Sequence, residues 1–391
     1  MQIKIHRGEN QIGGNIVEIS TEKTRILLDI GCELEEPADA PNIPDIPGLF
    51  ENASYDAVFI SHYHADHAGL ASYVDKKIPI YMGEKAFEIL RTSAQFKGET
   101  LAYECNCFSS RNKEIQIGDI IVRPYLVDHS AFDAYMFLIE ADGEKILYTG
   151  DFRANGRKSF DALLSRLPQS VDVLICEGTT TSREDKKNIS ETELEEVITE
   201  LCQKKTGPVF VLQAATNIDR IVTMYRSAKK SNRIFLEDVY MAGVAAAAGK
   251  TIPNPKDFDK SVRAFIANSR NEAHYQLLCE YGDKKIGQAQ ISKEKFVMCI
   301  RSSMQSYLRK LSEKMDFADG VLIYSMWEGY KEKPEMRKFL DGCKELGLEI
   351  VSQHVSGHAD TDTIKKLIDT VHPQKIMPIH TENADWFKQF E

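Results

Sequence analysis

A run of six residues carries four side chains of the types that bind metal ions. His62, His64, Asp66 and His67 occur in the stretch His-Tyr-His-Ala-Asp-His. His62 and His64 are two positions apart, so in an extended segment they project to the same side and can share one ion. Asp66 and His67 follow at a turn and can reach a second ion. Zinc prefers imidazole and carboxylate ligands, about four per ion, so this run predicts a metal site.

Three further ligands are expected where other apolar strands end. His129 follows an apolar run at 122–127, Asp151 follows one at 146–149, and His380 follows one at 376–379. Metal ligands often lie on loops that a buried scaffold positions. We therefore predict two zinc ions per chain, with manganese as the alternative, one bound by His62, His64 and His129, the other by Asp66, His67 and His380, and both bridged by Asp151.

Such a pair of ions can lower the pKa of a shared water towards about 7. Four positive metal charges against two carboxylates and one hydroxide leave the centre slightly cationic. The formal net charge of the whole chain is −10, which argues against a basic protein that coats nucleic acid. Bound cations can nevertheless dominate the local field, so an anionic substrate is still expected at the site.

The secondary-structure elements that must position these ligands are expected to differ in type and order along the chain. Short β-rich runs joined by turns fill the first third, and the Asp142-Gly143 pair predicts a hairpin. From about residue 182 charged helical stretches alternate with apolar strands, which predicts an α/β unit with a parallel sheet. A strand, a polar loop and a strand return after residue 349. This order predicts an α/β fold in which a segment at 184–348 is inserted between parts at 1–183 and 349–391.

The bulk composition suits an ordinary globular protein. The chain has 391 residues, 42% of them hydrophobic and 28% charged. No apolar run approaches the roughly 20 residues that span a bilayer, and the first residues lack the features of a signal peptide, so a cytoplasmic protein is expected. Cys105 and Cys107 form an isolated Cys-x-Cys pair, for which reduced thiols are expected rather than a metal site.

The ligand pattern resembles that of the metallo-β-lactamase superfamily, and all seven ligand positions are present. The resemblance implies an αββα sandwich with the metals at one edge between two sheets. Three further motifs resemble the β-CASP branch, which includes RNase J and the cleavage subunit of the pre-mRNA 3′-end machinery. They are Glu177 in Ile-Cys-Glu-Gly-Thr, His358 in His-Val-Ser-Gly-His-Ala and His380 in Pro-Ile-His-Thr-Glu. In that branch a β-CASP cap domain is inserted into the sandwich.

The resemblance implies a zinc-dependent ribonuclease that acts on single-stranded RNA by a two-metal mechanism. A histidine at the position of His380 is associated with RNA substrates in this branch, whereas DNA-processing members carry valine. The resemblance makes Asp66 a catalytic metal ligand and His358 the proton donor to the leaving oxygen, with Glu177 holding it. It leaves the assembly open, with a homodimer among the options.

Phosphate and base contacts are expected from several polar and aromatic residues. Ser356 and Gly357 could offer hydroxyl and N–H groups to a phosphate, as could Arg301, Ser302, Asn217 and Arg220 at strand ends of the inserted segment. Trp327, Tyr330 and Tyr240 could stack on bases. Core packing, caps and surface ion pairs are the alternative roles of these residues.

Other functions and cleavage modes remain open at this point. The same metal fold could hydrolyse a small thioester or lactam, and some β-CASP complexes use non-catalytic RNA-binding partners. Loss of ligands would indicate the latter, and no ligand is missing here. The sequence does not distinguish internal cleavage from cleavage that begins at the 5′ end.

Overall fold

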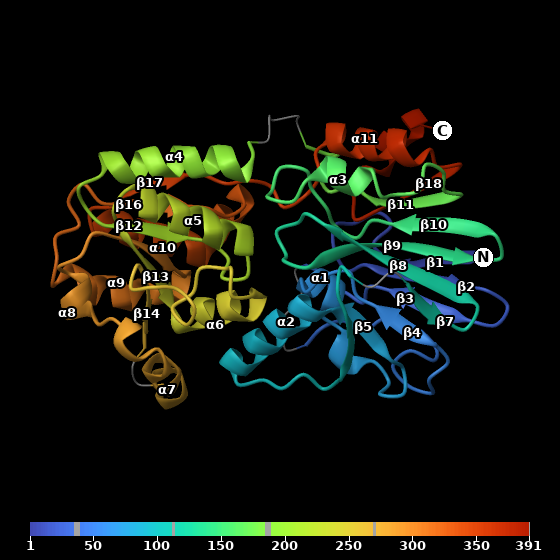
Figure 1. Cartoon of the computed structure of the whole chain (residues 1–391), viewed down its shortest axis with the longest axis horizontal. Helices are drawn as coiled ribbons and strands as arrows, with labels where there is room; N and C mark the ends of the chain where they lie inside the picture. The colour runs from blue at the N-terminus through green and yellow to red at the C-terminus, as the bar shows by residue number, and fades with distance from the viewer. Residues whose placement is uncertain (35–39, 112–113, 184–188, 269–270, 391) are drawn as a thin grey trace. The chain divides into compact units, whose positions relative to one another are not determined.

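The computed structural model describes residues 1–390, apart from 35–39, 112–113, 184–188 and 269–270. The chain forms two compact units, Met1–Asn188 with Gly357–Glu391, and Ile189–Ser356. Each unit combines β-sheets with helices (Figure 1), so the predicted α/β fold class is confirmed. Within the described part of the chain, no helix is both long and apolar enough to cross a membrane.

Two six-stranded sheets form the centre of the first unit. The first sheet contains β1 (Gln2–Arg7), β2 (Ile16–Ser20), β3 (Arg25–Leu28), β4 (Ala57–Phe59), β5 (Ile80–Gly83) and β6 (Cys105–Phe108), in that order. The second contains β18 (Lys375–Ile379), β11 (Val173–Glu177), β10 (Glu144–Tyr148), β9 (Ala134–Ala141), β8 (Ile120–Val127) and β7 (Ile115–Ile117). Apolar side chains of both sheets, among them Phe59 and Phe137, form one buried cluster, as expected for a sandwich whose strands alternate inward and outward residues.

Helices cover the outer faces of this sandwich. Helix α2 (Glu84–Lys97) follows β5, and α3 (Phe160–Leu164) and α11 (Thr361–Val371) lie against the second sheet (Figure 1). Helix α11 begins where the Asp360 side chain accepts a hydrogen bond from the Thr363 N–H, which satisfies a free donor of the first turn. Its apolar residues at 364, 367, 368 and 371 share one face and are buried in the cluster beneath the helix. The sequence thus dictates both the start and the buried side of α11.

The second unit is built on one six-stranded parallel sheet. Its strands, in sheet order, are β14 (Val262–Phe265), β13 (Ile234–Asp238), β15 (Phe296–Ile300), β12 (Val209–Leu212), β16 (Val321–Tyr324) and β17 (Glu349–Ser352). Its helices include α4 (Glu191–Lys204), α5 (Ile218–Lys230), α6 (Val239–Ala248), α7 (Glu272–Glu280), α8 (Gln288–Ile291), α9 (Gln305–Ser312) and α10 (Pro334–Glu345). Helices α4 and α5 lie side by side (Figure 1). The expectation of a parallel sheet is therefore confirmed.

Strand β17 differs from its expected place. The sequence predicted that residues from 349 onward close the first unit, but β17 pairs in parallel with β16 in the sheet of the second unit. The first unit resumes only at Gly357. The reason is that backbone hydrogen bonds assign a strand to a sheet, and a similar order of strands and polar loops in the sequence does not. The other predicted boundary, 183/184, adjoins residues outside the described part of the chain.

A buried carboxyl group lies on β13 of the second unit. The Glu237 side chain is completely buried, and neither of its oxygens has a hydrogen-bond partner. Burial, and then the neighbouring Asp238 carboxylate, hold the pKa of Glu237 well above its ordinary value. The folded protein therefore keeps a proton on Glu237 at pH values where the unfolded chain releases it.

Replacement of this carboxyl group should change how stability depends on pH. Because the folded state binds the extra proton, the free energy of unfolding falls by up to about 1.4 kcal/mol per pH unit above the pKa of the unfolded chain. Glu237→Gln removes this loss, so its melting temperature should gain more over wild type at pH 8 than at pH 5. Thermal unfolding followed by circular dichroism measures it, with the exposed Glu196→Gln as the control. Equal pH dependence in wild type and Glu237→Gln would contradict the assignment.

Candidate metal centre

Three histidines from two loops of the first unit direct ring nitrogens to one point. His62 and His64 follow β4, and His129 follows β8. The Nδ1 atom of His64 lies 3.1 Å from Nε2 of His62 and 3.2 Å from Nε2 of His129. These ligand atoms all lie within 4.8 Å of one another. They are the three histidines that the sequence assigned to one ion.

A second group lies beside the first. It contains Asp66, His67, Asp151 and His380, with all ligand atoms again within 4.8 Å. The Asp66 Oδ2 atom lies 3.1 Å from Nε2 of His380 and 3.9 Å from Nε2 of His67. Three parallel strands explain part of this convergence. Because β10, β11 and β18 run in parallel, their carboxyl ends meet at one edge of the sheet, where Asp151 and His380 follow β10 and β18.

The Asp151 carboxylate connects the two groups. Its Oδ2 atom lies 3.2 Å from Nε2 of His67 and 3.8 Å from Nε2 of His380 in the second group. The same oxygen lies 3.9 Å from Nε2 of both His62 and His129 in the first group. One oxygen atom thus faces four imidazoles of the predicted ligands, which is the position required of a bridging ligand.

Hydrogen bonds behind the ligands fix which ring nitrogen points inward. The Nδ1–H of His129 donates to the Gly357 carbonyl at 2.6 Å, and Nδ1 of His67 lies 2.7 Å from Oδ2 of Asp29. Metal-binding histidines usually donate their second N–H in this way, which leaves the other nitrogen as an acceptor. The Nε2 atom of His67 and the Oδ1 atom of Asp151 are buried without a hydrogen-bond partner. These orphaned polar atoms fit a bound cation, which would take the place of the proton on His67 Nε2.

Two residues that the sequence did not single out complete this outer layer. Asp29 follows β3, and its Oδ2 accepts hydrogen bonds from the Tyr148 hydroxyl at 2.5 Å and the Ser61 hydroxyl at 2.8 Å. Thr179 donates its hydroxyl to Glu177 at 2.7 Å and accepts from Nδ1 of His380 at 2.8 Å. An aspartate at a strand end was the only sequence signal for Asp29, and Thr179 lay unremarked beside Glu177.

Close backbone contact also constrains the loop that carries Asp66. A Cβ atom added at Gly31 would lie 1.7 Å from the Asp66 carbonyl oxygen. The backbone of the 65–69 turn donates or accepts hydrogen bonds with the segment after β3, including Ile30 N–H to His67 O at 2.7 Å. Only glycine leaves room for this approach. Gly31 therefore permits the close backbone contact that fixes the position of Asp66 and His67.

Electrostatics prepare the first group for cation binding. Burial lowers the pKa of His64 to about 4. Burial, and then neighbouring histidines, hold the pKa of His62 and His129 well below the ordinary value. Neutral imidazole is the form that binds metal ions. These three rings are therefore available as ligands at neutral pH.

In the second group the pKa of a histidine is raised, whereas in the first group the histidine pKa values are lowered. Burial acts to lower the pKa of His67, but Asp151, Asp29 and Asp66 outweigh it and hold that pKa well above its ordinary value. Burial acts to raise the pKa of Asp151, yet His380 and His67 hold it well below. Carboxylates here are thus charged, and the histidine protons compensate for them. A bound cation would replace those protons.

Glu177 and His358 form a pair next to the ligands. Nδ1 of His358 lies 3.1 Å from Oε2 of Glu177 and 3.6 Å from Oδ2 of Asp151. Burial acts to lower the pKa of His358, but the Glu177 and Asp151 carboxylates raise it above the ordinary value. The Oε1 atom of Glu177 accepts from the Phe152 N–H at 2.9 Å. Glu177 is thus held rigidly, and His358 tends to carry a proton.

The residues expected to bind substrate occupy several places. Gly357 belongs to the first unit, where its carbonyl accepts from His129, and Ser356 ends the second unit. Arg301 forms an ion pair with Asp238, and Ser302 follows in a short 3-10 helix. Asn217 caps α5 by accepting from the Arg220 N–H. Their contacts with substrate remain predictions.

Arg220 lies in the interior of the second unit and not at its surface. Its side chain is completely buried and lies 3.0 Å from Glu191, itself buried. It also donates to the carbonyl oxygens of Ser325 and Val355. A buried ion pair of this kind has a structural role, because loss of one partner leaves the other charge uncompensated. The expected contact of Arg220 with substrate also remains a prediction.

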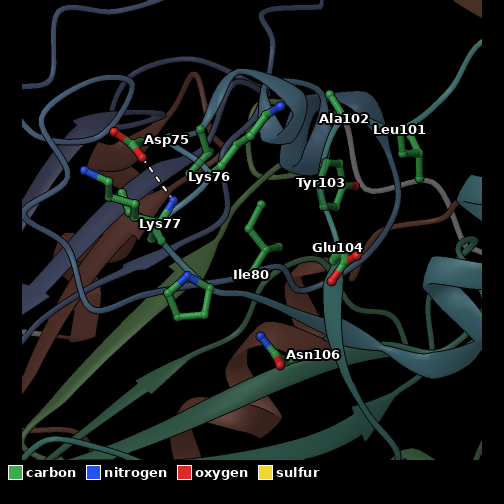
Figure 2. Close-up of a pocket in the computed structure, with 12 residues that line it drawn as sticks. Asp75, Lys76, Lys77, Ile80, Leu101, Ala102, Tyr103, Glu104 and Asn106 are labelled. Carbon is green, nitrogen blue, oxygen red and sulfur yellow. Dashed lines mark hydrogen bonds between the residues drawn. The ribbon is translucent and has the colours of Figure 1, made fainter.

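A cavity of about 570 Å³ lies elsewhere in the first unit, beside the starts of β5 and β6 (Figure 2). Figure 2 shows Lys76, Ile80, Tyr103 and Asn106 among its lining residues. Parallel strands place their starts and their ends at opposite edges, and β4 is parallel to β5. The cavity therefore lies at the edge away from the histidines that follow β4. Its lining contains no histidine or cysteine.

Comparison with known families places this geometry in context. A model of the β-lactamase superfamily domain matches residues 24–211. A model described as the Zn-dependent metallo-hydrolase RNA specificity domain matches residues 346–389. The first match contains six of the seven predicted ligands and the second contains His380, so the ligand set spans both.

Individual proteins align over most of the chain. An RNase J-like protein of Methanocaldococcus jannaschii is 27% identical over 97% of this chain and 92% of its own length. Ribonuclease J 2 of Streptococcus pyogenes is 22% identical over 97% of this chain and 69% of its own. Ribonuclease J of Sinorhizobium meliloti is 22% identical over 92% of this chain, which spans 64% of that protein.

A solved structure shares the fold. It is a protein of unknown function from Enterococcus faecalis, with a TM-score of 0.78 and 22% identity over 98% of this chain and 95% of that one. Both units therefore occur together in a known architecture.

Removal of the carboxylate that faces both groups should weaken metal binding. In Asp151→Ala the four facing imidazoles lose their shared anion, so we expect less zinc per chain after equilibration and dialysis, measured by atomic emission. Asp362→Ala, whose side chain is 93% exposed on α11, is the matched control and should keep the wild-type content. Equal zinc in both variants would show that Asp151 is not a ligand.

Proposed function

Because the chain belongs to the metallo-β-lactamase superfamily, in its β-CASP branch of RNase J-like proteins, we propose that it is a zinc-dependent ribonuclease. One observation carries the proposal. All seven candidate ligands converge beside a Glu177–His358 pair, and the region matched by the RNA specificity model contains both His358 and His380. The proposed substrate is single-stranded RNA in the cytoplasm.

The residues fit two zinc ions per chain, with manganese as the alternative metal. His62, His64 and His129 would hold one ion, Asp66, His67 and His380 the other, and Asp151 would contact both. When bound, such a pair of ions activates water and stabilises negative charge on phosphoryl oxygens. Five of the seven residues are buried (His62, His67, His129, Asp151 and His380). This burial strengthens the electrostatic effect, since the local dielectric constant is lower than that of water.

His358 would supply the proton that the departing ribose 3′-oxygen needs. Its Nδ1–H faces the Glu177 carboxylate, which leaves Nε2–H as the transferable proton of the imidazolium. Glu177 positions the ring and, with Asp151, favours its protonated form. A histidine with a pKa moderately above its ordinary value suits general acid catalysis near neutral pH. In this proposal Glu177 is a positioning residue.

End-labelled RNA tests both the activity and its mode. We expect the zinc-loaded protein to degrade single-stranded RNA, and Asp66→Ala to lose at least about 100-fold in rate because the second ligand group loses its carboxylate. Parallel substrates carry a 5′-monophosphate or a 5′-hydroxyl. Mononucleotides from the phosphorylated form alone indicate 5′-exonuclease activity, and discrete internal fragments indicate endonuclease activity.

Two outcomes would contradict the proposal. Turnover of a thioester or lactam without cleavage of RNA would indicate a small-molecule hydrolase. Tight RNA binding without cleavage, together with far less than two zinc ions per chain, would indicate a non-catalytic RNA-binding protein. Asp362→Ala again serves as the control, since its exposed side chain lies outside the ligand groups.

The role of His358 predicts a specific dependence on pH and on leaving group. The donor must be protonated, so RNA cleavage should fall as pH rises through the raised pKa of His358. His358→Asn should lower the rate on RNA by about 100- to 10,000-fold. It should spare a phosphodiester with a p-nitrophenol leaving group, which needs no proton to depart.

Glu177→Gln should move the alkaline limb of the pH profile to lower pH, because one charge that raises the pKa of His358 is lost. Rate measurements between pH 6 and 10 with both substrates check this pair of predictions. An equal loss on both substrates in His358→Asn would instead indicate that His358 only supports the structure.

A further inference from the structure

Two aromatic rings and a cation form a row on the second unit, just after the end of β16. Trp327 precedes the 3-10 helix η4 (Glu328–Glu332), Tyr330 lies within it, and Lys333 follows it. A 3-10 helix has three residues per turn, so residues three apart lie on the same side, about 6 Å apart along the axis. Trp327 and Lys333 flank this helix with non-helical backbone, so the distances between the side chains, and not the helical repeat alone, define the row.

Distances between the side chains confirm the row. The ring centroids of Trp327 and Tyr330 lie 5.4 Å apart with the rings nearly perpendicular. The Lys333 ammonium lies 5.2 Å from the Tyr330 ring centre, within the range of a cation–π contact. Edge-to-face rings and a cation over a ring are favourable contacts, so each member holds the next in place.

The row faces water although its rings are apolar. Trp327 is 48% exposed and Tyr330 is 37% exposed. A core role would bury these rings, because burial of apolar surface is what stabilises a fold. Exposed aromatic rings next to each other and next to a cation suit recognition of a ligand with flat faces and negative charge.

The backbone around Trp327 keeps the ring in this position. A Cβ atom added at Gly329 would lie 2.3 Å from the indole ring, so the ring rests directly on the glycine backbone. The Tyr324 hydroxyl, at the end of β16, donates to the Trp327 carbonyl at 2.9 Å. The ring is therefore ordered before any ligand binds, which lowers the entropic cost of binding.

The position in the sheet supports a binding role. In open parallel sheets ligands bind outside the carboxyl ends of the strands, and β16 ends at Tyr324, three residues before Trp327. Lys331 adds a second ammonium, 4.6 Å from the Tyr324 ring centre. Glu328 lies 2.8 Å from Lys331 and neutralises it in part, whereas among the described residues no carboxylate lies in ion-pair distance of Lys333.

We propose that Trp327, Tyr330 and Lys333 form a platform that binds single-stranded RNA, with bases stacked on the two rings and a phosphate near Lys333. The proposal rests on the proposed function, because it names a surface of the same substrate outside the metal ligands. Unpaired bases expose the flat faces that stack on aromatic rings, and this contact tolerates any base sequence. The platform thus gives affinity for RNA without base specificity.

Binding of a fluorescent single-stranded oligoribonucleotide, with EDTA present to prevent cleavage, tests the platform in the full chain. Loss of one stacked base should weaken binding by about 5- to 150-fold in Trp327→Ala and in Tyr330→Ala. Trp327→Phe should retain most of the affinity, because a ring remains. Tyr275→Ala is the matched control, since Tyr275 is 41% exposed on α7 and should have no effect.

Two further measurements separate stacking from a change in folding. The chain has two tryptophans, so Trp386→Phe leaves Trp327 as the only indole, and single-stranded RNA should quench its fluorescence whereas duplex RNA should not. Lys333→Gln should reduce the slope of log Kd against log salt by about 0.7.

The platform proposal is overturned if Trp327→Ala and Tyr330→Ala bind RNA as tightly as wild type. It is also overturned if the wild-type chain binds no single-stranded RNA. If wild type cleaves RNA while the variants bind as wild type does, the ribonuclease stands and the platform fails. If RNA quenches Trp327 but is not cleaved when zinc is added, the platform stands and the proposed activity fails.

Discussion

Burial of charge is the physical constraint on which the first unit depends. Asp151, His62, His67, His129 and His380 are all 2% exposed or less, and a charged carboxylate without partners is costly in such surroundings. Asp151 lies within 4 Å of five imidazoles, so the cluster compensates for its own burial only when every member is in place. A cation compensates in the same way, which couples metal binding to the stability of the edge that carries the site.

The sandwich meets this constraint by distributing the ligands over independent strand ends. Loops after β4, β8, β10 and β18 each contribute one or a few side chains, and the rigid sheets fix the distances between them. Hydrogen bonds from the Nδ1 atoms of His67, His380 and His129 to Asp29, Thr179 and the Gly357 carbonyl then fix the orientation of these three rings. Because strands rather than loops set the spacing, the site can be precise although its ligands span residues 62 to 380.

The second unit uses buried charge differently. Arg220 and Glu191 compensate for each other at 3.0 Å, whereas Glu237 is left without a hydrogen-bond partner and keeps its proton. Neither arrangement has the several converging imidazoles that would bind a cation. Among the groups of this unit that reach water, Lys333 beside the Tyr330 ring belongs to the proposed RNA platform.

Local pattern by itself determined much of this protein. Residue types, turn chemistry and alternation predicted the seven candidate ligands that the fold brings together. They also predicted the turn of positive φ at Asp142 and Gly143 between β9 and β10 and the parallel sheet of the second unit. These features are local, because residues that are neighbours in the sequence determine them. The short strands β6, β7 and β14 went unpredicted, because a few residues of mixed character acquire a strand conformation only from the strand beside them.

Only the tertiary structure decided which distant groups meet. It joined Asp29 to His67 and Thr179 to His380, and it assigned β17 to the sheet of the second unit. It also buried Arg220, which the sequence had suggested for contact with a phosphate. It also showed that Trp327 and Tyr330 remain exposed. The physical reason is common to all of these. Burial and long-range pairing depend on partners that lie far away in the sequence, and only the fold brings those partners together.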